Sequence, residues 1–534
     1  MSKLCRGGVL LMVALCTVAC SATPGPAPVE DPIASVSPKP TTTSTQPRKQ
    51  AQELAIGIDP VYTGFNPHLL ADDSRFTQTL AGLVLPSTFI AGTINGDLLE
   101  SVEVIDESGT VINTITPTDE ENKEETQPEQ PPLVEAKTIR YQLAPEAQWS
   151  DGTPITVADF EYLWDSMLKT PGTVNPAGYR AIEDVTSASG GKVIEVTFAE
   201  SFSQWRTLFN HLLPSHLLRG EKFSTVLAGG IPASAGKFTM RNFDRNRGVV
   251  TLNRNDRFWG KEPARVEIVS FREIRSTAQG LELISNGQIS FMDITPTQTS
   301  TRAFELIPDT QVRVEADSYA LEVVANAKLS KILRQELQTI IDPTLIAQLA
   351  YGRDSEMSVP ERDHKPEPLH LKAMTEPLRI GVDPANPVAA AAATTMVHVL
   401  AGMDVRATVV QADTNELMRS LIPAGGVDVV VALSNTTVAD KYACPVKEVL
   451  GANRSGYCNE ETEIFLKEYN AGLKTEEELE KVIAELEAEE ALVTTLAYDV
   501  RLEVLGKGIL GPDEDLTQWP DGLSSLEQWR IETK

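Results

Sequence analysis

Hydrophobic residues recur along the chain with two spacings, which predict alternating strands and helices. Every second residue is apolar in 138–143 (TIRYQL), and short apolar runs occupy 378–383 and 426–434, as expected for half-buried and buried strands. Apolar residues recur at helical spacing in 157–169 and in 475–499. Because strands alternate with helices through the second half of the chain, the pattern favours α/β lobes.

The same spacings predict further elements and a chain of more than one lobe. Strands are expected at 192–199, 266–274 and 500–505, and helices at 333–352 and 461–473. With 534 residues, the chain is too long for one simple core, so we expect two or three lobes. Hydrophobic residues make up 41% of it, which is enough to fill such cores.

The helix expected over 157–169 has a defined start and a single apolar face. Thr156 is placed to cap its first turn. Asp159 lies in that first turn, where the helix dipole favours a negative charge. The residues expected to face a core are Phe160, Leu163, Trp164 and Met167.

The first 50 residues predict export and a membrane tether. Lys3 and Arg6 precede a short apolar run, so residues 1–19 are expected to be a signal peptide. The sequence around Cys20 resembles the lipobox of bacterial lipoproteins, although the usual leucine is replaced by Thr17. We therefore expect a lipidated Cys20, with ordinary cleavage as the alternative. Residues 20–50 are rich in Pro, Ser and Thr and are expected to form an extended tether.

Two cysteines remain beyond the signal and the tether. Cys444 and Cys458 are expected to form a disulfide, because an exported protein meets an oxidising compartment. Closing a loop of that size stabilises the fold by about 3 kcal/mol in the chain-entropy picture. Two metal ligands are the alternative, but neither histidine nor further cysteine lies near them in the sequence.

The charge of the chain bears on its partners. The formal net charge is −28, which repels phosphate backbones, so we expect no nucleic-acid partner. Residues 117–132 are acidic, bounded by proline and without a large apolar residue, and are expected to form a surface insertion.

Sequence motifs of enzymes are absent or incomplete. No H-E-x-x-H and no G-x-S-x-G occurs. Residues 506–511 (GKGILG) fit the dinucleotide fingerprint, but Pro512 follows where a helix would have to begin. We therefore expect a protein that is not an enzyme and uses no cofactor and no metal, with a hydrolase of unknown type as a weaker hypothesis.

A turn between a strand and a helix carries a family resemblance. Residues 141–164 (YQLAPEAQWSDGTPITVADFEYLW) resemble the signature segment of the family 5 extracellular solute-binding proteins, which include peptide-binding proteins of ABC importers. The matching residues are Trp149, Asp151, Gly152, Thr153, Pro154 and Asp159. Other segments resemble the family in its own order, among them 65–68, 212–218, 250–260, 280–294, 333–342 and 454–468.

The resemblance implies a two-lobed α/β fold of the type II periplasmic-binding-protein class, with a ligand cleft between the lobes. It places lobe I at 51–305, lobe II at 306–499 and a return of the chain to lobe I at 500–534. It also implies ligand contacts from three loops, which for this sequence gives Tyr62, Phe65, Tyr319, Asn326, Ser434, Asn435 and Asp440. Core packing is the alternative role for each aromatic residue, and Asn326 is alternatively a turn residue.

The resemblance also bears on the ligand. Peptide-binding members carry an acidic residue that pairs with the peptide amino group, in the loop that here reads SNTTVADKYACPV, where Asp440 is the one acidic candidate. The tether, the acidic insertion, and the sequences of 147–164 and 455–458 (SGYC) resemble lipoproteins of this family from mycolate-bearing actinobacteria. That resemblance implies an anchor on the outer face of the membrane and a ligand of the phosphatidylinositol mannoside type. It also implies control of phosphatidylinositol mannoside and lipoarabinomannan synthesis, with a membrane mannosyltransferase as partner. The alternative is an ABC importer receptor for peptides or another small solute, with a permease as partner.

Overall fold

The computed structural model describes residues 52–117, 136–362, 365, 367–520 and 522–532. Within it, Ala51–Lys534 forms one compact unit. The expected signal peptide, the expected tether with Cys20 and almost all of the expected acidic insertion lie outside the described residues. Among the described residues, no helix combines the length and the apolar character that crossing a membrane requires.

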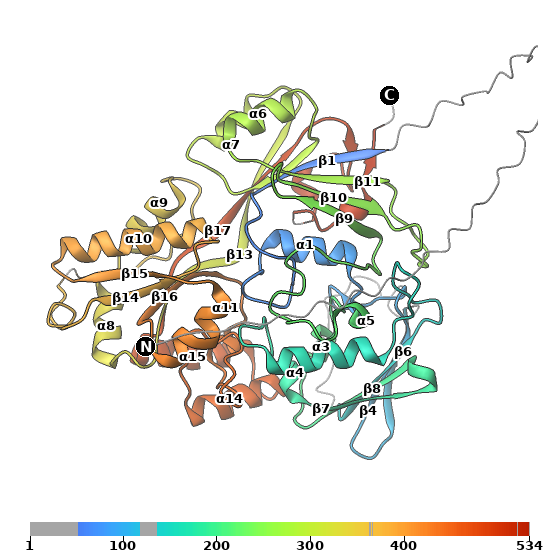
Figure 1. Cartoon of the computed structure of the whole chain (residues 1–534), viewed down its shortest axis with the longest axis horizontal. Helices are drawn as coiled ribbons and strands as arrows, with labels where there is room; N and C mark the ends of the chain where they lie inside the picture. The colour runs from blue at the N-terminus through green and yellow to red at the C-terminus, as the bar shows by residue number, and fades with distance from the viewer. Residues whose placement is uncertain (1–51, 118–135, 363–364, 366, 521, 533–534) are drawn as a thin grey trace, which may run out of the picture. The chain divides into compact units, whose positions relative to one another are not determined.

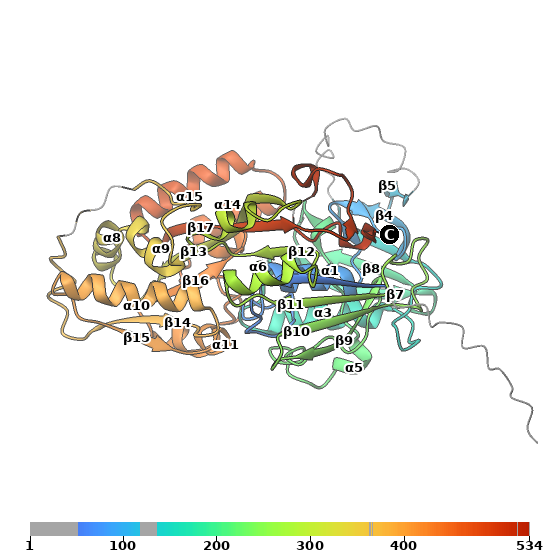
Figure 2. The same ribbon diagram turned by 90° about the horizontal axis from the view of Figure 1, so that it is seen from above.

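One long mixed sheet runs through the whole unit and joins its two α/β lobes (Figures 1 and 2). Its strands, in spatial order, are β15 (Ala407–Gln411), β14 (Leu378–Val382), β16 (Val429–Ser434), β13 (Gln311–Ala325), β17 (Val493–Leu505), β12 (Phe291–Ile294), β1 (Glu53–Ile58), β11 (Ile268–Glu273), β10 (Val249–Arg254) and β9 (Phe238–Asp244).

The long strands β13 and β17 cross between the lobes as an antiparallel pair. Their register shifts between Ala316 and Ala320, and again between Leu321 and Glu322. On one side of these irregularities β17 pairs with β12 of lobe I, and on the other side β13 pairs with β16 of lobe II. The two-lobed α/β fold expected from the sequence is therefore confirmed.

A second, antiparallel sheet extends lobe I. Its strands, in spatial order, are β5 (Val111–Ile115), β4 (Leu99–Ile105), β6 (Thr138–Leu143), β8 (Val193–Phe198) and β7 (Ile182–Ala188). Two short hairpins complete the strands: β2 (Phe89–Ile90) with β3 (Thr93–Ile94), and β18 (Ile509–Leu510) with β19 (Arg530–Ile531).

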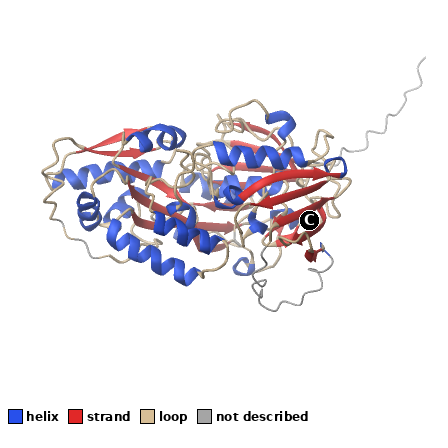
Figure 3. Cartoon of the chain, turned by 90° about the horizontal axis from the view of Figure 1, so that it is seen from below, coloured by secondary structure: helices blue, strands red, loops and turns tan. Residues whose placement is uncertain are grey.

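Helices flank the strands of both lobes (Figure 3). Those of lobe I are α1 (Arg75–Val84), α3 (Val157–Lys169), α4 (Ala177–Ala181), α5 (Ser215–Leu218), α6 (Thr277–Ser285) and α7 (Ser300–Glu305). Those of lobe II are α8 (Lys331–Ile340), α9 (Pro343–Tyr351), α10 (Pro387–Gly402), α11 (Thr414–Glu416), α12 (Ile422–Ala424), α13 (Val438–Tyr442), α14 (Glu460–Asn470) and α15 (Glu476–Glu490).

The signature segment builds the core of lobe I. Thr156 and Asp159 form a capping box at the start of α3, as the sequence predicts. Asp159 is buried and also accepts hydrogen bonds from the backbone N and the Oγ of Ser215, at 3.0 and 2.8 Å. The expected apolar face is confirmed, with Phe160 fully buried and Trp164 half-buried against the same core. Burying one such side chain stabilises the fold by about 2 kcal/mol.

Two helices expected from the sequence end earlier than predicted. The helix predicted over 333–352 is two helices, because Pro343 cannot continue α8 and Asp342 instead caps α9. The helix predicted over 475–499 ends at Glu490, where Ala491 takes a left-handed conformation with φ 52°. Its remaining residues begin the strand β17.

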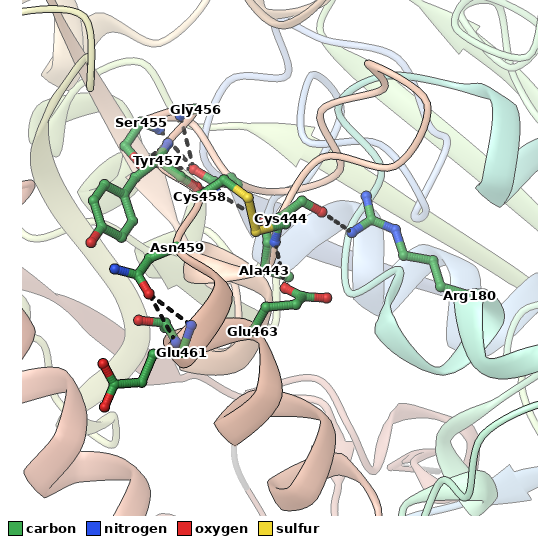
Figure 4. Close-up of a disulfide and its surroundings, with 12 residues drawn as sticks. Arg180, Ala443, Cys444, Ser455, Gly456, Tyr457, Cys458, Asn459, Glu461 and Glu463 are labelled. Carbon is green, nitrogen blue, oxygen red and sulfur yellow. Dashed lines mark hydrogen bonds between the residues drawn. A yellow bond between two sulfur atoms is a disulfide. The ribbon is translucent and has the colours of Figure 1, made fainter.

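A disulfide joins Cys444 to Cys458 in the loop between α13 and α14, with the Cα atoms 4.8 Å apart (Figure 4). Two side chains hold the backbone of Cys444. The Cys444 backbone N donates to Glu463 Oε2 at 2.8 Å, and its carbonyl accepts from Arg180 Nη1 at 3.1 Å. The disulfide therefore ties the loop after β16 to α14, and Arg180 ties it to lobe I.

Candidate ligand-binding site

A cavity of about 350 Å³ lies between the two lobes. Lobe I contributes the loop after β1, the start of α1 and the end of β12, whereas lobe II contributes α10, α11, α12 and β16. One wall is apolar and belongs to a hydrophobic cluster that lobe II builds together with Leu70 of lobe I. The residues of that cluster that face the cavity are Leu70, Leu417, Met418, Ile422 and Val430.

A second cavity of about 550 Å³ lies beside the first, mainly within lobe I. The two cavities share five lining residues: Arg75, Thr79, Asp317, Tyr319 and Leu523. Aromatic side chains of the second cavity include Phe89, Phe258 and Trp259. Both volumes fall within the range of roughly 300–1,000 Å³ that is usual for small-molecule sites.

The polar wall of the first cavity is built around Arg501 of β17. Its Nε contacts Asp293 Oδ1 at 2.8 Å, and its Nη1 contacts Asp59 Oδ2 at 2.6 Å. Burial alone would lower the pKa of Arg501, but the carboxylates of Asp293 and Asp59 raise it well above its ordinary value. Arg501 therefore stays charged and holds the loop after β1 against the end of β12.

Arg75, at the start of α1, links this wall to the crossing strands. Its Nε contacts Asp293 Oδ2 at 3.1 Å and its Nη1 contacts Asp317 Oδ1 at 3.2 Å. Asp317 lies within the register shift of β13. The ion pair between Arg75 of α1 and Asp317 of β13 thus separates the two cavities.

Asp499 of β17 is a buried carboxylate that lines the first cavity and is 6% exposed. Its Oδ1 accepts a hydrogen bond from the backbone N of Val500 at 3.0 Å. Burial raises the pKa of Asp499 to about 6, although the nearby Arg501 lowers it. The nearby Asp317 and Asp59 raise it further.

Tyr319 and Asp73 form a second polar link at the partition. The Tyr319 hydroxyl donates to Asp73 Oδ1 at 2.8 Å, and Gln78 donates to the same oxygen at 2.9 Å. Burial raises the pKa of the Asp73 carboxyl, and these two hydrogen bonds lower it.

Arg454 lines the first cavity near the end of β16 and is 6% exposed. Its Nη1 donates to Ser434 Oγ at 2.8 Å, and this is its one hydrogen bond among the described residues. Burial lowers the pKa of the Arg454 guanidinium, whereas Glu322 and Asp73 raise it. A guanidinium nevertheless stays protonated in proteins, so the cavity contains a buried positive charge.

The ligand contacts predicted from the sequence are distributed unevenly. Tyr62 lines the first cavity and is 56% exposed, Tyr319 lines both cavities, and Asn435 lines the second. Phe65 lies instead in the core of lobe I, with its ring 5.3 Å from that of Phe243. Ser434 is buried behind Arg454.

Two polar residues from that prediction, Asn326 and Asp440, form hydrogen bonds that hold backbone segments together. Asn326 is buried and its Nδ2 donates to the carbonyls of Ile422 and Val427, so it closes a turn. Asp440 is buried outside both cavity linings. Its Oδ1 accepts from the Ala177 backbone N at 3.0 Å and its Oδ2 from the Thr437 hydroxyl at 2.8 Å. The carboxylate thus fastens α13 to lobe I.

The sequence analysis did not predict the charged wall around Arg501. The one available signal was the alternation in the second half of β17, where Asp499, Arg501 and Glu503 alternate with Val500, Leu502 and Val504. Such charges inside a buried strand require partners. The partners themselves are distant in sequence, since 442 positions separate Arg501 from Asp59. Among the described residues, no group of His, Cys, Asp and Glu side chains is arranged to hold a metal ion.

Comparisons with known proteins agree with this architecture. Residues 133–360 match the family described as bacterial extracellular solute-binding proteins, family 5 Middle. The oligopeptide-binding protein AppA from Bacillus subtilis, solved in complex with a nonapeptide, superposes with a TM-score of 0.62. It shares 14% identity, and the match covers 90% of this chain and 100% of AppA, which shows the common fold.

Two curated relatives come from Mycobacterium tuberculosis. The probable monoacyl phosphatidylinositol tetramannoside-binding protein LpqW is 30% identical over 363 residues, which cover 66% of this chain and 53% of LpqW. The oligopeptide-binding protein OppA is 30% identical over 160 residues, which cover 29% of this chain and 27% of OppA. The match therefore spans about half the length of LpqW, and both relatives are named as binding proteins. In the sequence of residues 133–360 and in its fold, the chain is similar to the family 5 bacterial extracellular solute-binding proteins.

Proposed function

We propose that this protein is a non-enzymatic envelope lipoprotein that binds a polar glycolipid of the phosphatidylinositol mannoside type. In this proposal it regulates phosphatidylinositol mannoside and lipoarabinomannan synthesis, acts with a membrane mannosyltransferase, and is anchored to the outer face of the membrane through Cys20. The observation that carries the proposal is the 30% identity to LpqW over 363 residues.

The chemistry of the cavities supports a polyhydroxylated ligand with a charged group. Carboxylates and guanidinium groups on one wall offer acceptors and donors for hydroxyl groups, and the other wall is apolar. The aromatic side chains of the second cavity offer flat apolar surface against a sugar ring. Two adjoining cavities with a shared partition suit a ligand longer than either one.

The position of Asp440 also supports a ligand other than a peptide. In peptide-binding members of the family, an acidic residue of this loop is expected to pair with the peptide amino group. Here the carboxylate of Asp440 is bonded to Ala177 and Thr437 and lies outside both cavity linings. A peptide amino group would have no acidic partner in this loop.

The second candidate is a receptor of an ABC importer for peptides or another small solute. The similarity to OppA of M. tuberculosis and the fold shared with AppA favour it. In that case the charged wall around Arg501, rather than the loop after β16, would have to hold the peptide termini.

Native mass spectrometry of the mature protein purified from its own envelope, followed by solvent release of bound molecules, tests the proposal. An inositol-mannoside mass supports it. A set of short peptides assigns the protein to the importer class. As an independent arm, deletion of the gene is expected to change the mannoside and lipoarabinomannan profile, and an unchanged profile contradicts the regulatory role.

A further inference from the structure

The surroundings of Arg454 distinguish it from the other arginines of the site, Arg501 and Arg75. Arg501 and Arg75 each contact at least two carboxylates, whereas Arg454 has its single hydrogen bond to the hydroxyl of Ser434. It comes from the loop before the disulfide residue Cys458, and this loop places its guanidinium at the cavity end of β16. A buried guanidinium without a carboxylate partner is costly to the fold.

The carboxylates of Glu322 and Asp73 raise the pKa of Arg454, but both have other partners. Glu322 is buried and forms an ion pair with Lys441. Asp73 accepts hydrogen bonds from the Tyr319 hydroxyl and from Gln78. Neither lies within ion-pair distance of Arg454 among the described residues. The remaining N–H groups of Arg454 are therefore left for whatever fills the cavity that it lines.

We propose that Arg454 anchors an oxyanion of the ligand, either a phosphodiester or a carboxylate, at the β16 end of the cavity between the lobes. A planar guanidinium binds such groups through two parallel N–H···O bonds. The apolar wall around it excludes water, which strengthens the interaction. This inference rests on the proposed function, because the phosphodiester of a phosphatidylinositol mannoside is one source of the oxyanion. A peptide carboxylate is the other source.

Arg334 provides a matched control. It is also a buried arginine of lobe II, but it lies outside both cavities and is fully partnered. Its Nε donates to the Glu490 carbonyl at 2.8 Å, its Nη2 pairs with the Glu490 carboxylate, and its Nη1 donates to the Leu329 carbonyl at 2.5 Å.

The variants Arg454→Met, Arg454→Lys and Arg334→Met are compared with wild type in two assays. Thermal unfolding of the ligand-free proteins is the first. Arg334→Met breaks a buried ion pair and is expected to lower Tm by about 3–5 °C. Arg454→Met removes a buried charge that lacks a carboxylate partner, so Tm is expected to hold or rise. A purely structural arginine at position 454 would instead give a fall in Tm.

Calorimetric titration is the second assay, with two pairs of probes. One pair is glycerophosphoinositol and myo-inositol, and the other is trialanine and its C-terminal amide. Wild type and Arg334→Met are expected to prefer the oxyanion-bearing member of one pair by about 10- to 100-fold. Arg454→Met is expected to lose that preference. Arg454→Lys is expected to keep part of it, because lysine retains the positive charge but lacks the paired N–H donors of the guanidinium.

The outcomes separate this inference from the proposed function. Preference for glycerophosphoinositol supports both, and preference for trialanine supports the role of Arg454 while moving the protein to the importer class. The inference is overturned if Arg454→Met keeps the full preference, if its Tm falls as that of Arg334→Met does, or if wild type binds neither oxyanion probe. A glycolipid found by native mass spectrometry would then leave the proposed function standing without Arg454.

Discussion

Replacing Asp499 by asparagine is expected to stabilise the ligand-free protein in a pH-dependent way. Burial raises the pKa of this carboxyl from 3.8 to about 6 in the folded protein. Between about pH 4 and pH 6 the folded state therefore binds a proton that the unfolded state does not, so the slope of stability against pH is negative for this group. The contribution of Asp499 to the free energy of unfolding is therefore most favourable below pH 4, and it decreases as the pH rises through about 6.

The magnitude follows from the size of the shift. About two pKa units correspond to about 3 kcal/mol of stability that the ionised Asp499 costs at pH 7 and above. The Asp499→Asn variant removes that cost and keeps an oxygen for the Val500 backbone N. Arg501 retains its contacts with Asp293 and Asp59. The variant should thus gain up to about 3 kcal/mol at pH 7.5 and nothing near pH 4.

Urea unfolding of wild type and variant, followed by tryptophan fluorescence at several pH values from 4.5 to 7.5, measures this difference. Burial lowers the pKa of His68 to about 4, so this side chain opposes the trend as the pH falls, but it is present in both proteins and cancels. Asp404→Asn is the control, because its side chain is 91% exposed. A stability difference that stays constant from pH 4.5 to 7.5, or a variant less stable than wild type at pH 7.5, would refute the reasoning.

Three further predictions test how the site is supported. Replacing both Cys444 and Cys458 by serine should lower the free energy of unfolding by about 3 kcal/mol, and reductant should then no longer affect urea unfolding. Asp159→Ala should cost about 3 kcal/mol or more in the same assay, because it leaves several buried donors without an acceptor. Tyr62→Ala should weaken calorimetric ligand binding by up to about tenfold without lowering Tm, whereas Phe65→Ala should cost about 3–5 kcal/mol of stability.

Local signals explain which parts of the fold were predictable. The start of α3 is encoded by residues within one turn, Thr156 and Asp159, so its position followed from the sequence. The end of α15 has no such local signal, because residues 491–505, which follow Glu490, contain neither glycine nor proline. Ala491 ends the helix in a conformation that alanine seldom adopts, and pairing with β13 over the next residues makes β17 a strand.

The candidate site was less predictable because its contacts join distant parts of the chain. The family resemblance led to Tyr62, Tyr319 and Asn435, which do line the cavities. It could not show that Asp440 faces away from them, because that depends on contacts with Ala177, 263 positions earlier. The partners of Arg75 and Arg501 depend on the register of β12 and β17, which the hydrophobic pattern does not determine.

The order in which the chain pairs its strands has a consequence for folding. β1 pairs with β11 and β12, more than 200 residues later, and β13 pairs with β17 near the C-terminal end. Neither half of the long sheet is complete until residues near 505 are available. Such distant pairings make folding slow, and until β17 arrives both β12 and β13 present unpaired edges. Translocation in an unfolded state would therefore be followed by a period of exposure to aggregation, and a chain truncated before residue 493 should form neither lobe.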